Sequence, residues 1–329
     1  MNRCATALAA FAVVATLAVT REASARPAPP ICADLGADLG VGVSDYSEVG
    51  DWDAQAAATD GVRWRFIYWY VVPTSDPPDA ISSWLQGNAA LAQSLGAVPV
   101  FTFYELLEIG QQAGLTGAES DVVQQVLASP SLMSSYFDHF VFVLQSLANE
   151  PPPVIVHVEP DSWGFMMWSF GVEGNGDASS VPVMVASSGY PDVAGFSDDA
   201  GGFGKALLKL RDEYAPQVRL GWHASNFREG TGGDVVSSFY GSMGAWDVLV
   251  TEHPHVEADP AQWWLPWDEA KVQQNLSFFS TLTQAAGTPI LLWQEQLGTT
   301  DYHLFDGDPT MLTRFADAGV GGVLFSMRG

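Results

Sequence analysis

Carboxylates follow several of the most hydrophobic stretches of the sequence. The stretch VIVHVEPDSW, residues 154–163, runs through five mostly apolar residues into Glu159 and Asp161. VLVTEHPH reaches Glu252 in the same way, and LLWQEQLG reaches Glu295. One carboxylic acid can protonate a leaving oxygen while a second carboxylate attacks as a nucleophile or activates water. Such a pair is what the hydrolysis of a glycosidic bond requires.

Further polar and aromatic residues stand at or near the ends of the other apolar runs. Aromatic rings offer faces on which sugars stack, and the 12 tryptophans supply many of them. Any one of these residues could instead be a helix cap, a surface acid or core packing, so only the whole set indicates a site. We expect Glu159, Glu295 and Glu252 to be catalytic, without a metal or cofactor. The expected substrate-binding residues are Asp45, Tyr46, Trp69, Tyr104, Glu105, Asp161, Trp163, His223, Asn226, His253, Trp264, Trp293 and Gln294.

These side chains meet only if the apolar runs are strands of one sheet. Eight such runs recur, at 41–46, 62–72, 97–107, 154–161, 218–227, 246–255, 289–298 and 319–327. Most are continuously hydrophobic, as in parallel strands covered by helices. Between them, Phe203, Leu207, Leu210 and Tyr214 recur at helical spacing, and residues 131–150 and 268–287 also read as helices.

This alternation predicts an α/β fold, a (β/α)8 TIM barrel over residues 39–329, in which the last outer helix can be missing. In such a barrel the carboxyl ends of the strands form the active site. A doubly wound open sheet is the alternative. It is disfavoured because no G-x-G-x-x-G follows the first run and no phosphate-binding P-loop occurs.

The N-terminal residues predict export. Arg3, an apolar run over residues 4–19 and the triplet Ala23, Ser24, Ala25 are typical of a secretory signal peptide, residues 1–25, with a Pro-rich segment at 26–38. We expect the mature chain to be a secreted monomer that keeps Cys32 alone, without an intramolecular disulfide. A net charge of −25 disfavours nucleic acid and anionic membranes as partners. The acidity fits solubility better than attraction of a cationic amino-sugar polymer, because the acidic residues are spread along the chain.

The motifs resemble the TIM-barrel glycoside hydrolases, in particular the clan whose catalytic glutamates end strands four and seven. The matching residues are Glu159 in VHVEPD and Glu295 in LLWQEQLG. The resemblance implies that Glu159 is the acid/base and Glu295 the nucleophile, with Glu252 as a third candidate. Val158 stands where the clan usually has asparagine. If Glu159 points into the barrel mouth, strand alternation places His157 on the same face.

The expected function is therefore a secreted glycoside hydrolase that cleaves a polysaccharide or oligosaccharide with two carboxylates. A metal-dependent hydrolase or deacetylase is the first alternative, because His253 and His255 form an H-x-H pair near His223. A barrel that binds glycans without cleaving them is the second. A chelator would inactivate only the metal enzyme, and a binder would retain glycan without releasing product.

Overall fold

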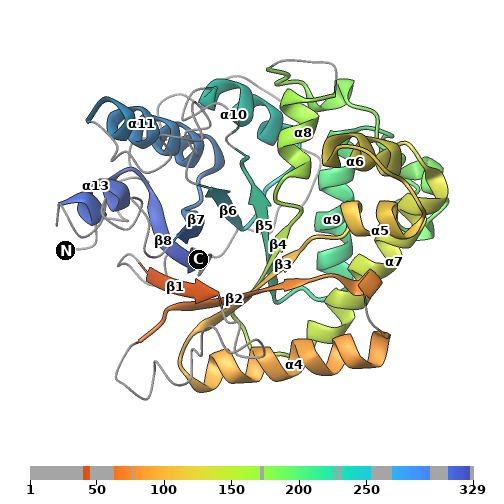
Figure 1. Ribbon diagram of the computed structural model, residues 1–329, viewed down its shortest axis with the longest axis horizontal. Coiled ribbons are helices and arrows are strands. Elements are labelled where there is room, and N and C mark those ends of the chain that lie inside the picture. Colours follow the sequence, from red (N-terminus) through yellow and green to blue (C-terminus); the bar gives the residue numbers. More distant parts are fainter. Residues whose placement is uncertain are drawn as a thin grey trace.

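Eight parallel strands close into a barrel in chain order (Figure 1). The computed structural model describes residues 40–44, 63–75, 77–170, 174–225, 227, 232–252, 269–296 and 310–326. The strands are β1 (Gly40–Ser44), β2 (Phe66–Val71), β3 (Val98–Phe103), β4 (Val154–Val158), β5 (Val218–His223), β6 (Val248–Glu252), β7 (Ile290–Gln296) and β8 (Val320–Ser326). The predicted (β/α)8 barrel is confirmed. Pairing of Val41 in β1 with Val323 in β8 closes it, which an open sheet would not do.

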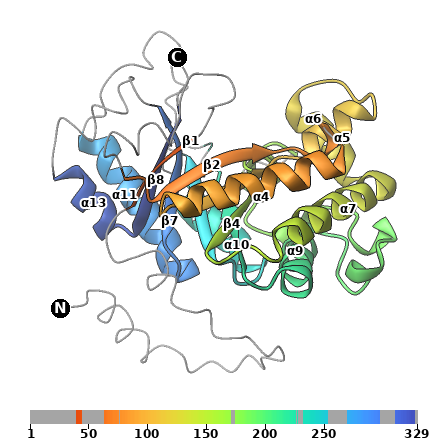
Figure 2. The ribbon, with the colours of Figure 1, turned by 90° about the horizontal axis from the view of Figure 1, so that it is seen from below.

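Helices connect the strands and surround them (Figure 1). They are α4 (Pro78–Ser94), α5 (Leu106–Gln112), α6 (Glu119–Leu127), α7 (Pro130–Leu147), α8 (Ser162–Trp168), α9 (Ala200–Tyr214), α10 (Gly233–Gly241), α11 (Glu269–Ala286) and α13 (Met311–Asp317). Short 3-10 turns are η3 (Pro73–Ser75), η4 (Ala178–Ser180), η5 (Ala186–Ser188) and η6 (Pro191–Val193). In the described part of the chain no helix follows β8. Both α5 and α6 follow β3 in the chain, and Figure 2 shows them side by side.

The three helices predicted from periodicity are present, and their ends have clear causes. Asp199 precedes α9, and its carboxylate accepts a hydrogen bond from the Gly202 N–H at 2.7 Å. Phe203, Leu207 and Leu210 lie on the buried face of that helix. Gly287 follows α11 with φ +67, a left-handed conformation that glycine adopts without steric cost.

Two apolar cores flank the strands. Val154, Val156 and Val158 of β4 pack outward against the helices, in one large outer core. Ile155 of the same strand packs inside the barrel with Phe66, Tyr68, Val98, Val100, Val248, Val250, Leu291, Trp293 and Leu324. Alternation along β4 thus directs Ile155 inward, and His157 two residues later follows it. The barrel interior is filled with side chains below the mouth.

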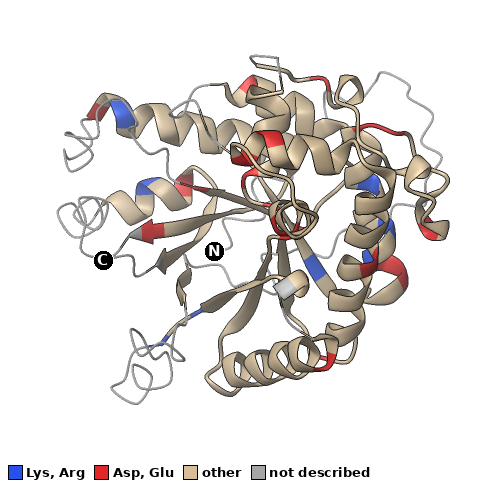
Figure 3. Cartoon of the chain, turned by 45° about the vertical axis from the view of Figure 1, so that its right-hand side comes forward, with Lys and Arg blue, Asp and Glu red and all other residues tan. Residues whose placement is uncertain are grey.

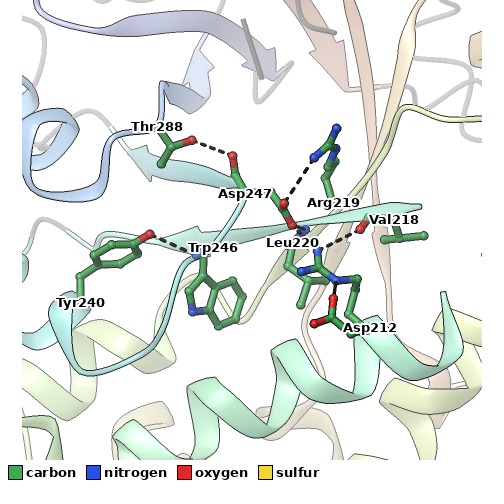
Figure 4. A network of polar contacts seen from close by, with 9 residues as sticks. Asp212, Val218, Arg219, Leu220, Tyr240, Trp246, Asp247 and Thr288 are labelled. Carbon is green, nitrogen blue, oxygen red and sulfur yellow. Dashed lines mark hydrogen bonds and ion pairs between the residues drawn. The ribbon is translucent and has the colours of Figure 1, made fainter. Parts of the chain in front are cut away.

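A charged network joins β5, β6 and β7 at their amino ends (Figure 4). Arg211 and Asp247 form an ion pair in which each residue is only 8% exposed. The Asp247 carboxylate also accepts the Leu220 N–H at 2.9 Å, and Arg219 lies 3.5 Å away. The Thr288 hydroxyl donates to the Asp247 carbonyl at 2.6 Å. Because these contacts lie at the end opposite the mouth, they stabilise the barrel rather than serve a site there.

Acidic residues are distributed over many elements of the described chain and do not form one patch (Figure 3). Within the described residues, no helix combines the length and hydropathy needed to cross a bilayer. The predicted signal peptide, residues 1–25, and the Pro-rich segment, residues 26–38, lie outside the described residues.

Candidate active site

A chain of hydrogen bonds crosses the barrel mouth from β3 to β6. Thr102 Oγ1 lies 3.2 Å from His157 Nδ1, and His157 Nε2 lies 2.8 Å from His223 Nδ1. His223 Nε2 then contacts the Glu252 carboxylate. The residues face inward from consecutive strands, with Thr102 and His157 paired in register. The chain therefore fixes Glu252 through three neighbouring strands.

The charge on the Glu252 carboxyl group determines which atoms donate and which accept in this chain of hydrogen bonds. Burial, with the nearby His223, lowers the pKa of His157 well below its usual value, so the His157 ring is neutral. An ionised carboxylate can only accept hydrogen bonds. When the Glu252 carboxyl group is ionised, it accepts this hydrogen bond and His223 Nε2 donates it. Glu252 is still partly open to solvent, with 15% of its side chain exposed, whereas the His223 side chain is fully buried.

Aromatic rings surround this chain. The Trp293 indole packs edge-on against His157 and His223, with ring centroids 5.0 and 5.5 Å apart. The centroid of the Tyr70 ring lies 5.7 Å from that of Trp293 and 6.3 Å from that of Tyr104. The Gln294 amide donates a hydrogen bond to the Tyr70 hydroxyl. Trp293, Gln294 and Tyr104 are therefore brought together around Tyr70.

Asp161 is the second carboxylate at the mouth. It directly precedes α8 but its side chain makes no capping hydrogen bond there, and it is partly exposed. Burial raises the pKa of Asp161 to about 6; His223 lowers it, while Glu252 and Glu119 raise it further. Asp161 follows the carboxyl end of β4, which is the end of the barrel that forms the mouth. Tyr104 belongs to the mouth residues because its ring packs edge-on against Tyr70, and its hydroxyl donates to Glu119.

Glu159 does not share this environment. It is fully buried, and its carboxylate accepts the Glu105 N–H at 3.0 Å, the Leu106 N–H at 3.2 Å and the Ser162 hydroxyl at 3.2 Å. Its backbone has φ +50, so the alternation that directs His157 inward ends there. The carboxylate joins the starts of α5 and α8 instead of opening on the mouth. Burial raises its pKa to about 8.

Glu295 is also buried, with 1% of its surface exposed. A register shift separates Leu292 from Glu295, and Gln294 between them has φ +58. Glu295 pairs in register with Phe325, which belongs to the outer core. Residues paired across neighbouring parallel strands face the same side. The irregularity thus directs Glu295 away from the face of Trp293, contrary to the simple alternation.

Three predicted binding residues lie in the outer layer, where a substrate cannot reach them. Glu105 is fully buried; its carboxylate lies 2.6 Å from His139 Nδ1 on α7 and also binds Thr74. Trp69 stacks on Phe101 of β3, and Trp163 is fully buried with its indole N–H donating to Val158. Each is therefore a packing residue, because its side chain lies on the outer side of the barrel or on the buried face of α8.

The remaining predicted residues lie outside the described residues: Asp45, Tyr46, Asn226, His253, Trp264, and His255 of the metal alternative. Within the described part of the chain, no three His, Cys, Asp or Glu side chains are arranged to hold a metal ion. Both His223 ring nitrogens face protein partners. Sequence reasoning missed Tyr70, Thr102 and Glu119. Strand alternation could have identified the first two, but nothing local connects Glu119 to Tyr104.

Comparisons with known proteins support the fold alone. No family model matches the sequence, and no curated protein matches it. A modular endo-β-1,4-mannanase of glycoside hydrolase family 26 from Cellulomonas fimi superposes with a TM-score of 0.55 at 11% identity, over 88% of this chain and 65% of that protein's length. Endo-glycoceramidase II from Rhodococcus sp. superposes with a TM-score of 0.53 at 9% identity, over 88% of this chain and 73% of that protein. A broad-specificity endoglucanase from an uncultured bacterium superposes with a TM-score of 0.50 at 11% identity, over 89% of this chain and 88% of that protein. The fold is thus the TIM barrel that these glycoside hydrolases share.

Proposed function

We propose that this protein is a glycoside hydrolase that cleaves a polysaccharide with carboxylates at the mouth of its barrel. One observation carries the proposal: His223 fixes Glu252 at the end of β6, and a second, partly exposed carboxylate, Asp161, follows the end of β4. Glycoside hydrolysis needs two such groups flanking the scissile bond. The aromatic rings of Tyr70, Tyr104 and Trp293 next to them suit the apolar faces of sugars.

The two carboxylates have different environments, as an acid and a base or nucleophile require. Glu252 accepts a hydrogen bond from His223, which stabilises a negative charge on it. The Asp161 side chain makes no capping hydrogen bond to α8, and the charges of Glu252 and Glu119 raise its pKa. In this proposal, Asp161 and Glu252 take the roles that the family resemblance assigns to Glu159 and Glu295.

Mannans and glucans are the first substrates to test, because fold neighbours are named as a mannanase and an endoglucanase. We also propose that the protein acts outside the cytoplasm, since residues 1–25 have the pattern of a secretory signal peptide. Its acidity fits an exported soluble enzyme but does not select a polymer.

The experiment is the release of reducing ends from a panel of polysaccharides by the protein without residues 1–25. We expect product from at least one polymer, a loss of 100-fold or more with Glu252→Gln, and no effect of a chelator. Glu213→Gln is the matched control, because Glu213 is an exposed glutamate paired with Lys209 on α9. Inactivation by the chelator would favour the metal alternative, and glycan retention without product would favour a binding barrel.

A further inference from the structure

The chain of hydrogen bonds across the mouth begins at a hydroxyl group on β3. Thr102 Oγ1 lies 3.2 Å from His157 Nδ1, and among the described residues this is its only hydrogen-bond partner. Thr102 is fully buried, as are His157 and His223. A hydroxyl group carries one hydrogen, which needs an acceptor when it is buried. Within the described part of the structure, His157 Nδ1 is the acceptor that the Thr102 hydrogen can reach.

The two histidine rings are arranged for a single hydrogen bond between their edges. His157 Nε2 lies 2.8 Å from His223 Nδ1, whereas the ring centroids lie 5.0 Å apart and the ring planes are inclined by 25°. The short distance between the nitrogens shows that the rings meet edge to edge. The Trp293 indole packs edge-on against both rings. The rings are therefore held in an orientation that links Thr102 to Glu252.

Only one order of donors and acceptors leaves no hydrogen of this chain without an acceptor. If Thr102 donates to His157 Nδ1, the neutral His157 ring carries its hydrogen on Nε2 and donates it to His223 Nδ1. His223 then donates from Nε2 to the Glu252 carboxylate. A Glu252 that donated to His223, or a His223 ring with both nitrogens protonated, would reverse the bond between the rings. His157 Nδ1 would then carry a hydrogen, and the buried Thr102 hydrogen would lose its acceptor.

We propose that Thr102 is a positioning residue of the hydrolytic reaction, which sets the direction of the hydrogen bonds so that His223 donates to Glu252 and holds that carboxylate ionised. This inference rests on the proposed function, in which Glu252 acts as the nucleophile or the base. A hydrogen bond accepted by a carboxylate favours its charged form. Thr102 is itself buried away from the substrate, and it acts through one ring on β4 and a second on β5.

The charge on Glu252 also depends on the other groups around it. His223 from β5 contacts its carboxylate, and Asp161 after β4 interacts with it electrostatically. Trp293 is its uncharged neighbour in register on β7. Replacing Thr102 leaves all three of these groups in place. A change in the pH dependence of a Thr102 variant therefore reports the direction of the hydrogen bonds.

The ring tautomers test this direction without any substrate. Histidine labelled with 15N in both ring nitrogens gives different NMR signals for protonated and unprotonated nitrogens, and the spectra of His157→Gln and His223→Gln assign the signals. At pH 7 we expect both rings to carry their hydrogen on Nε2. A hydrogen on Nδ1 of either ring would overturn the inference.

Kinetic measurements test the effect on the reaction. Thr102→Val keeps the shape of the side chain and removes the hydroxyl group, whereas Thr102→Ser keeps the hydroxyl group. With mannan or glucan as the substrate, Thr102→Val should move the acid limb of kcat/KM upward by roughly 1 pH unit, because Glu252 then takes up a proton more readily. Its kcat on the plateau should stay within about threefold of the wild-type value. Thr102→Ser should keep the wild-type limb, and so should Thr281→Val, a change at an exposed position of α11.

The outcomes separate this inference from the proposed function. If the wild type cleaves a polymer and the acid limb of Thr102→Val does not move, the inference is wrong and the proposed function stands. An equal loss of kcat at every pH in Thr102→Val and Thr102→Ser would make Thr102 a packing residue only. A wild-type protein that cleaves no polysaccharide would refute the proposed function, and with it the role of Thr102 in the reaction, whatever the ring tautomers are.

Discussion

Glu159→Gln should change how the stability of this protein depends on pH. The Glu159 carboxyl group is fully buried and its pKa is raised to about 8, first of all by burial. A glutamine has the same shape, and its carbonyl oxygen can accept the Glu105 and Leu106 N–H groups while its amide faces Ser162. The variant removes the ionisation and keeps the packing.

The magnitude follows from the two pKa values. The ordinary value is 4.5, and the folded protein holds the proton until about pH 8. Between these pH values the folded state binds more protons than the unfolded chain, so the wild-type free energy of unfolding falls as the pH rises. Each pH unit contributes about 1.4 kcal/mol, which gives an upper limit of about 5 kcal/mol over the interval. The glutamine variant should lack this decline.

Urea unfolding followed by tryptophan fluorescence, at pH values from 4.5 to 9, measures the effect. The free energy of unfolding of Glu159→Gln minus that of the wild type should increase steadily up to about pH 8 and then level off. Glu213→Gln, which changes an exposed glutamate, should give a constant difference. Parallel wild-type and Glu159→Gln curves would show that Glu159 ionises normally, and would refute its assignment as a buried neutral group.

Three further substitutions test other parts of the structure. Asp247→Asn leaves the buried Arg211 with only the exposed Asp212 as counter-charge and should cost up to about 3–5 kcal/mol in urea unfolding; a cost below 1 kcal/mol would contradict the buried pair. His157→Gln interrupts the support of His223 and should lower kcat about 10- to 100-fold with little change in KM, so an unchanged kcat would argue against the hydrogen-bonded chain. Gln294→Gly removes a left-handed backbone strain of about 1–2 kcal/mol, but glycine also loses more conformational entropy on folding, by a similar amount. The free energy of unfolding should therefore stay within about 1 kcal/mol of the wild-type value, while KM should rise. Marked destabilisation by that glycine would disprove the strain.

The strands and the main helices could be predicted from local pattern. Continuous apolar runs identified all eight strands, although several runs extended past the strand end. The run at 97–107 contains β3, which stops at Phe103, and α5 begins at Leu106. Hydrophobicity alone does not separate the last turn of a strand from the buried first turn of a helix, since both face the core.

The candidate site was predicted less completely. Trp293, Gln294 and His223 lie near one another, because the carboxyl ends of the barrel strands meet at the mouth. Glu105, however, faces His139 of α7 and lies away from the mouth. Its partner is 34 residues away in the sequence, so no local pattern could have revealed the contact.

The sequence by itself determined the number and order of the strands, because the periodicity of apolar side chains is a local property of each segment. Only the tertiary structure decided which carboxylates reach the mouth. A single residue with positive φ, Glu159 in one strand end and Gln294 in another, changes the face on which the following side chains lie. Such a conformation costs about 1–2 kcal/mol for a residue other than glycine. It persists because contacts from other elements hold it, as the N–H groups of α5 do for Glu159 and Tyr70 does for Gln294.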